Sequence, residues 1–136
     1  DLLTPILRYQ LSNHLGSASL ELGADGAVLS YEEYHPYGTT AYQAGRSVAE
    51  VSLKRYRYTG KERDEETGLN YHGARYYASW LSRWISCDPE MSTNLYVYAL
   101  CSPTKLNDPN GMSPEESLTK GPYQVVRGDH VYFKWL

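Results

Sequence analysis

The sequence predicts a mainly β protein made of antiparallel β-hairpins, with a short helical segment near the C-terminus. Segments in which polar and apolar residues alternate recur along the first half of the chain, separated by glycine-containing turns. The aromatic residues are 14 tyrosines, three tryptophans and one phenylalanine. Tyrosine suits a half-buried sheet, because its ring packs while its hydroxyl stays hydrated or reaches a partner. Near residue 80 the pattern changes to helical spacing.

The first predicted hairpin is Ser17–Leu22 followed by Ala27–Tyr34. In the first of these segments small or polar residues alternate with apolar ones, and the sequence Gly-Ala-Asp-Gly at 23–26 predicts the connecting turn. His-Pro-Tyr-Gly at 35–38 ends the hairpin. Residues 39–50 have only a weak pattern, so we expect a mobile loop there.

The second predicted hairpin is Val51–Thr59 followed by Leu69–Tyr77. Charged and aromatic residues alternate in Arg-Tyr-Arg-Tyr at 55–58, as in a strand with one hydrated face. The charged segment 60–68 is the predicted turn. Gly73, inside the returning strand, predicts a bulge or the close approach of another backbone segment.

The last part of the chain is less regular. Ser79–Ile85 places Trp80, Leu81, Trp84 and Ile85 at helical spacing and predicts one or two helical turns. Asn94–Leu100 fits a helix or a strand equally well. Ser-Pro-Glu-Glu at 113–116 has the pattern of a helix start, and we place a boundary between Met112 and Ser113.

Composition excludes several classes of function. The net charge of −3 gives no broad basic surface for nucleic acid. No apolar run reaches the roughly 20 residues of a membrane helix. The sequence starts without a signal-peptide pattern or a methionine, so we expect a fragment or a processed piece. Cys87 and Cys101 are interpreted as free, partly buried thiols rather than a disulfide, and no cysteine or histidine spacing predicts a metal or other cofactor.

The predicted sheets leave open edges, because two or three hairpins do not close a barrel. The hairpins instead have the character of units that stack on further copies of themselves. We therefore expect further β-structure upstream in the same polypeptide or on another chain, and poor folding of residues 1–136 alone.

Three stretches resemble Rhs/YD-repeat proteins. NHLGSASLELGADGAVLSYEEYHPYG at 13–38 resembles their hairpin repeat, and RYRYTGKERDEETGLNYHGARYYASWLSRWISCDPE at 55–90 resembles the Rhs repeat-associated core domain. NLYVYALCSPTKLNDPNGM at 94–112 resembles the end of that core. The resemblance covers residues 8–112 and rests on the combination of Y-T-G-x-E, D-x-x-T-G-L, A-R-Y-Y, R-W and D-P-x-G.

The resemblance implies a function. Rhs proteins and the C subunits of insecticidal Tc toxins wind hairpins into a hollow β-shell, and an intramolecular aspartyl protease in the core cuts after D-P-x-G-L to free an enclosed C-terminal toxin. Residues 1–112 are then the core domain (hairpins 8–78, autoprotease segment 75–112), and 113–136 begin the variable toxin. The implied partners are the rest of the shell, the enclosed toxin and a delivery apparatus, in a secreted or delivered complex used in bacterial competition.

The same resemblance carries over to named residues. Asp88 and Asp108 match the catalytic aspartates, Arg75 matches the arginine of A-R-Y-Y, and the cleaved bond is Met112–Ser113. Two nearby carboxyls sharing one proton can hydrolyse a peptide, because the ionised member activates water while the protonated member polarises the carbonyl. Met112 replaces the usual leucine, Cys-Ser-Pro at 101–103 stands where Asn-Asn-Pro is common, and the loop after Asp88 is shorter than usual.

Simpler interpretations stay open beside this one. Asp-Pro-Asn-Gly at 108–111 is a good type I turn by itself. Asp88 followed by a proline can simply cap the end of a helix, and Arg75 can form an ion pair with Glu62 or Asp64. The rival functions are a catalytically inactive shell segment and a YD-repeat module whose tyrosines bind a sugar or a protein surface.

Overall fold

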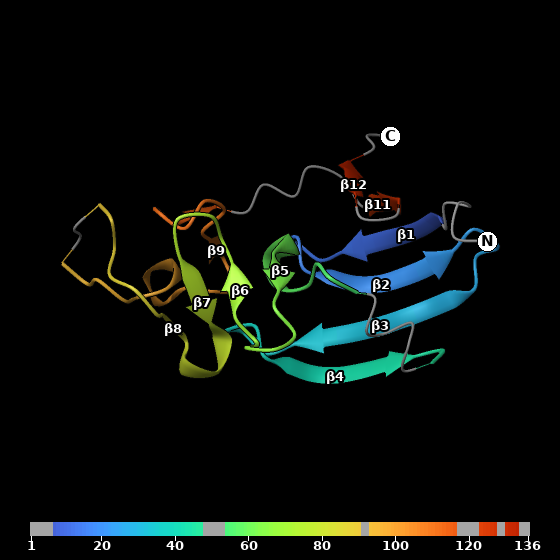
Figure 1. Cartoon of the computed structure of the whole chain (residues 1–136), viewed down its shortest axis with the longest axis horizontal. Helices are drawn as coiled ribbons and strands as arrows, with labels where there is room; N and C mark the ends of the chain where they lie inside the picture. Colours follow the sequence, from blue (N-terminus) through green and yellow to red (C-terminus); the bar gives the residue numbers. More distant parts are fainter. Residues whose placement is uncertain (1–6, 48–53, 91–92, 117–122, 128–129, 134–136) are drawn as a thin grey trace.

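The larger of two main sheets has six antiparallel strands. In the computed structural model, which describes residues 7–47, 54–90, 93–116, 123–127 and 130–133, the strand order is β12-β11-β1-β2-β3-β4 (Figure 1). The strands are β1 (Leu7–Ser12), β2 (Ala18–Gly23), β3 (Val28–Tyr34), β4 (Thr40–Gly45), β11 (Tyr123–Arg127) and β12 (His130–Phe133). Strands β2 and β3 confirm the first predicted hairpin and its turn.

Strand β4 contradicts the expected mobile loop. Its backbone pairs with β3 from Ser30↔Gly45 to Tyr34↔Thr40. The side chains of residues 41–47 are all exposed, so no buried face imposes the alternation by which a strand is recognised. Backbone hydrogen bonds define this strand. Because such bonds do not require particular side chains, the sequence pattern does not predict it.

The second sheet is smaller and lies at one end of the larger one (Figure 1). Its order is β5-β6-β7-β8, formed by β5 (Glu62–Arg63), β6 (Asn70–Tyr71), β7 (Tyr76–Ala78) and β8 (Arg83–Trp84). A third, two-residue pairing joins β9 (Leu106–Asn107) to β10 (Glu115–Glu116). The returning half of the second predicted hairpin is therefore present as two short strands, β6 and β7, on either side of Gly73.

The helical segment predicted at 79–85 is present only as a single 3₁₀ turn. The described residues form no α-helix and only three 3₁₀ turns, η1 (Tyr58–Gly60), η2 (Ser79–Leu81) and η3 (Ala99–Cys101). Turn η2 stops at Ser82, which takes a left-handed φ of 57°, and β8 follows directly. Helical spacing without a common buried face explains the error, because Trp84 is buried while Trp80, Leu81 and Ile85 are exposed.

Three further segments differ from expectation. Within 54–59 the backbone forms one isolated bridge, Tyr56↔Glu62, and then η1, while 51–53 lie outside the described residues. Asn94–Leu100 is neither helix nor regular strand, with a single bridge between Val97 and Arg83 before η3. Glu115–Glu116, expected at a helix start, form β10 instead.

The apolar core lies where the two main sheets meet. Buried side chains from the 13–17 turn, η1, the second sheet and the 98–99 segment pack together: Leu15, Tyr58, Tyr77, Trp84, Tyr98 and Ala99. The rings of Tyr77 and Tyr98 stack with centroids 4.1 Å apart. Aromatic packing of this kind contributes stability beyond the area it buries, and here it fixes the second sheet against the loops of the first.

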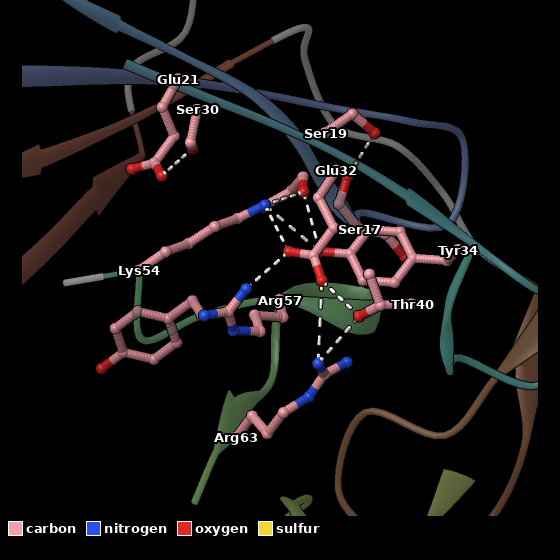
Figure 2. A network of polar contacts seen from close by, with 12 residues as sticks. Ser17, Ser19, Glu21, Ser30, Glu32, Tyr34, Thr40, Lys54, Arg57 and Arg63 are labelled. Carbon is pink, nitrogen blue, oxygen red and sulfur yellow. Dashed lines mark hydrogen bonds and ion pairs between the residues drawn. The ribbon is translucent and has the colours of Figure 1, made fainter. Parts of the chain in front are cut away.

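A buried carboxylate provides a second connection. Glu32 on β3 is 0% exposed and is surrounded by cations from the segment that leads to the second sheet (Figure 2). Its Oε2 lies 2.7 Å from Arg57 Nη1 and 2.9 Å from Lys54 Nζ, and its Oε1 lies 3.7 Å from Arg63 Nη1. The Thr40 hydroxyl donates to Oε1 at 2.6 Å. One acidic group therefore ties β3 and β4 to residues 54–63.

Cys87 and Cys101 are free, as expected, but both are exposed rather than partly buried. No helix in the described part of the chain is long and apolar enough to cross a membrane.

Candidate functional site: a buried aspartate turn

The turn between β9 and β10 begins with a buried carboxylate. Asp108 is 1% exposed. Its Oδ1 accepts hydrogen bonds from the backbone N–H groups of Gly111 at 2.8 Å and Met112 at 3.1 Å. The predicted turn is thus confirmed, and Gly111 supplies the positive φ of 74° that closes it.

Arg75 reaches this turn from the loop between β6 and β7. Its guanidinium is buried against the Trp84 ring, with Cζ 4.1 Å from the ring centroid. Nη2 lies 3.4 Å from Asp108 Oδ2, and Nε donates to the Gly111 carbonyl at 2.6 Å. The structure therefore pairs Arg75 with Asp108, not with Glu62 or Asp64, and joins it to the carbonyl that precedes Met112.

Asp88 lies in the loop that follows β8 and is also buried. Its Oδ1 accepts a hydrogen bond from the Glu90 N–H at 2.8 Å, and its own N–H donates to the Leu95 carbonyl at 2.9 Å. Because no helix precedes it, the carboxylate forms a local turn instead of the helix cap that was the simpler interpretation. Arg75 Nη1 donates to the same Leu95 carbonyl at 3.4 Å. The shared carbonyl thus links the main chain at Asp88 to Arg75, whose guanidinium contacts the Asp108 carboxylate.

The bond expected to be cleaved lies on the outer side of the turn. Met112 is 37% exposed and Ser113 is exposed as well. The side-chain carbonyl of Asn110 accepts the Met112 N–H at 2.9 Å and the Ser113 N–H at 3.4 Å. The Met112–Ser113 bond therefore follows immediately after the residues that contact Asp108 and Arg75.

Two polar side chains that the sequence analysis missed also hold this turn. The Nδ1 atom of His72 lies 2.6 Å from the Asp108 carbonyl oxygen, so Nδ1 carries the proton and donates it. The Lys61 ammonium donates to the Pro109 carbonyl. Neither residue has a sequence signal for this role, because the acceptors are main-chain carbonyls 36 and 48 positions away.

The predicted close approach at Gly73 is confirmed here. A Cβ atom on Gly73 would lie 3.0 Å from the Asn110 carbonyl oxygen, and one on Gly111 would lie 2.8 Å from the Arg75 backbone nitrogen. The Ala74 N–H also donates to the Asn110 carbonyl at 3.0 Å. The turn and the 72–75 loop thus pack backbone against backbone, which only glycine permits at these two positions.

Burial controls the ionisation of the site. Removal from water raises the pKa of Asp108, against the opposing influence of the Gly111 N–H and the Arg75 charge. Burial also lowers the pKa of His72 to about 4, so this ring is neutral at pH 7. A buried carboxyl with a raised pKa can act as a proton donor.

Exposed tyrosines form two pairs away from this turn. Tyr31 and Tyr42 lie on β3 and β4 with ring centroids 6.2 Å apart, and Tyr71 and Tyr76 lie on β6 and β7 with centroids 5.1 Å apart. All four residues are at least 36% exposed. These pairs are the surface that a sugar- or protein-binding role would use.

The fold and the turn define a class of protein segment built from antiparallel β-hairpins, and comparisons with known proteins identify its relatives. No family model matches the chain. The chain is 48% identical over 111 residues to toxin subunit YenC2 of Yersinia entomophaga, an alignment that covers 79% of this chain and 11% of that protein. It is 34% identical over 95 residues to the tRNA3(Ser)-specific nuclease WapA of Bacillus spizizenii, covering 65% of this chain and 4% of that protein.

A solved structure supports the same conclusion. The crystal structure of TcdB2-TccC3 superimposes on 79% of this chain with a TM-score of 0.75 and 48% identity, and this chain covers 5% of that one. The chain is therefore homologous, over most of its length, to the C subunits of Tc toxins and to the WapA toxins of the Rhs type, and over 41% of its length to the toxin protein Tse5 of Pseudomonas aeruginosa. It spans about a tenth of the length of YenC2.

Proposed function

We propose that this chain is the C-terminal core of an Rhs-type toxin shell and that it cuts itself once, between Met112 and Ser113. Residues 1–112 are the core, and residues 113–136 begin the toxin that the cut frees. The rest of the shell is supplied by further polypeptide, either upstream or on a partner chain, which would cover the outer edge of β4. The protein acts within a secreted or delivered toxin complex.

The observation that carries this proposal is the position of Arg75. A single buried guanidinium contacts the Asp108 carboxylate and the Gly111 carbonyl, one residue before Met112. It also shares the Leu95 carbonyl with Asp88. One cation therefore contacts the carboxylate of Asp108 close to the bond proposed to be cut, and a shared carbonyl links it to the main chain at Asp88.

In the proposed reaction Asp108 is the acid and Asp88 is the base. Asp88 removes a proton from a water molecule, whose oxygen attacks the Met112 carbonyl carbon, while protonated Asp108 polarises the carbonyl oxygen. The C–N bond then breaks, and Ser113 leaves as an amine after taking up the proton that Asp88 removed. Because the substrate is tethered to the site, its high effective concentration makes a slow site sufficient for one turnover.

The contacts of Asp108 also favour one alternative. Its Oδ1 accepts two N–H groups of its own turn, as a purely structural carboxylate would. In that case the chain is a shell segment without activity, and removing the charge of Asp108 changes no processing.

The test is the intact mass of the full-length polypeptide that carries this chain and of its Asp108→Asn variant, after expression and overnight incubation. We expect the parent to split between Met112 and Ser113 and the variant to stay whole. Asp25→Asn is the matched control, since Asp25 is an exposed turn aspartate whose Oδ1 accepts the Ala27 N–H at 3.1 Å. Equal processing of the parent and Asp108→Asn would establish the inactive alternative.

A further inference from the structure

The main-chain carbonyls of four consecutive residues in the turn are each held by a donor from outside it. The carbonyl of Asp108 accepts the proton of His72 Nδ1, that of Pro109 accepts Lys61 Nζ, that of Asn110 accepts the Ala74 N–H, and that of Gly111 accepts Arg75 Nε. The donors come from residue 61 and from the single loop 72–75. We call this set of four contacts the carbonyl clamp.

The clamp ends just before the bond proposed to be cleaved. The Gly111 carbonyl is the last of the four, and the next carbonyl in the chain belongs to Met112, a residue that is partly exposed. The clamp therefore fixes the backbone up to one residue from the reaction. Misplacing reacting groups by about 1 Å can slow a reaction by roughly a hundredfold, so the position of this backbone matters for the rate.

The clamp is built for the backbone and not for particular side chains of the turn. Its acceptors are peptide carbonyls, and the close approach of Gly73 and Gly111 brings the two backbones into contact. His72 is 2% exposed and its ring packs edge-on against Trp84, with centroids 5.0 Å apart. The aromatic core therefore holds the imidazole in place, and the imidazole in turn holds the Asp108 carbonyl through its hydrogen bond.

We propose that Lys61 and His72 are positioning residues for self-cleavage, and that the carbonyl clamp selects Met112–Ser113 as the bond that is cut. This inference rests on the proposed function. It assigns to Lys61 and His72 no contact with the reacting atoms. They hold the Pro109 and Asp108 carbonyls. In this proposal that contact positions the Met112–Ser113 peptide bond for the two proposed catalytic carboxyls, Asp88 and Asp108.

Lys61→Met is the sharpest test, because methionine keeps an unbranched apolar stem and removes the donor. In the full-length polypeptide we expect self-cleavage to slow by about tenfold to a hundredfold and the cut to lose its single position. The position is read from the N-terminal sequence and mass of the released fragment. Lys61→Arg restores a donor and is expected to recover both the rate and the single cut.

The control is Lys105→Met, the same replacement at an exposed lysine just before β9. It should leave the rate and the cut unchanged. Slower cleavage at an unmoved cut that arginine does not repair would indicate a general loss of stability and would overturn the assignment. An unchanged rate and a single unchanged cut in Lys61→Met would overturn it as well.

A second measurement separates failure of this inference from failure of the proposed function. Hydrogen–deuterium exchange of the uncleaved polypeptide, followed in a peptide covering 106–116, reports on the clamp without any cleavage. We expect faster exchange in Lys61→Met and in His72→Leu than in the parent, with no change in peptides from β2 and β3. Unchanged exchange in 106–116 would overturn the clamp. If the parent never cleaves itself but exchange is faster in the variants, the clamp exists as a structural feature. Its role in self-cleavage and the proposed function are then both overturned.

Discussion

At the scale of single residues, the chemistry of the turn depends on the pKa of Asp108, which burial raises although neighbouring hydrogen bonds and charge lower it. Asp108 accepts two backbone N–H groups and faces a guanidinium, and each of these favours its ionised form. Burial nevertheless raises its pKa above the ordinary value of 3.8. Of the two proposed catalytic carboxyls, Asp108 is therefore assigned as the proton carrier.

This assignment predicts a pH dependence for self-cleavage. Because the raised pKa keeps Asp108 protonated to a higher pH than an ordinary aspartate, the active fraction decreases as the pH rises through that pKa. We expect the first-order rate of fragment release to be higher in mild acid than at pH 8, measured by quenched samples and intact mass. A rate that increases steadily from pH 5 to pH 9 would contradict Asp108 as the acid.

The residues of the site differ in whether the sequence alone predicts their role. The turn was predictable from Asp-Pro-Asn-Gly, and the resemblance to Rhs proteins identified Arg75 and the two aspartates as candidates. Lys61, His72 and Glu32 were not found, because their partners are backbone carbonyls or charges far away in the sequence. A hydrogen bond to a backbone carbonyl places no requirement on the side chain of its acceptor, so it leaves no pattern to recognise.

At the scale of elements, the site is formed by a turn packed on a loop. Gly111 has a φ of 74°, and a Cβ atom there would lie 2.8 Å from the Arg75 backbone nitrogen. Gly26, in the β2–β3 turn, has a φ of 80°, but a Cβ atom there would meet nothing within 4 Å. Both glycines have a left-handed φ, and they differ in the space around them.

That difference provides a matched pair of substitutions. Gly26→Ala introduces only the strain of a left-handed alanine, about 1–2 kcal/mol. Gly111→Ala adds a steric clash with the 72–75 loop and should displace the turn, so we expect self-cleavage to be strongly slowed in Gly111→Ala and unchanged in Gly26→Ala. Fragment release is measured by mass, and equal cleavage in the two variants would show that the close contact does not matter.

Elements also show why the fold was only partly predictable. Strands β2 and β3 were found because their residues alternate in polarity and a glycine turn joins them. Strand β4 has no buried face, and β8 is two residues long, so backbone pairing defines both. The helical spacing at 79–85 reflects an exposed apolar surface around Trp80, and only the 3₁₀ turn η2 forms there.

At the scale of the whole molecule, Glu32 and its cations connect the larger sheet to residues 54–63, the segment that carries Lys61 of the carbonyl clamp. Lys61 belongs to the same stretch of chain as the cations Lys54, Arg57 and Arg63. The buried charge cluster around Glu32 therefore holds the stretch of chain that supplies one donor of the clamp. Removing one partner of a buried ion pair leaves uncompensated charge, which typically costs about 3–5 kcal/mol.

We accordingly expect Glu32→Gln to lower the thermal midpoint of the full-length protein substantially. The matched control is Glu33→Gln, the next residue on β3, whose exposed carboxylate accepts the Tyr31 hydroxyl at 2.7 Å. Surface contacts of this kind contribute little, so this variant should unfold within about a degree or two of the parent. Equal decreases of the thermal midpoint in the two variants would show that the buried ion-pair cluster stabilises the fold no more than a surface contact does.

The pH dependence of the Glu32→Gln effect tests its electrostatic origin. Burial opposes ionisation of Glu32, but Lys54, Thr40 and Arg57 outweigh it and lower its pKa from 4.5 to about 2. Because the pKa is lower in the folded protein, the stabilisation by Glu32 is complete above pH 4.5 and is lost as the pH falls towards 2. The difference in thermal midpoint between the parent and Glu32→Gln should therefore be constant from pH 8 to pH 5 and should shrink in stronger acid. If it stays constant down to pH 2, the charge of Glu32 does not provide the stabilisation, and packing around its side chain must account for the effect.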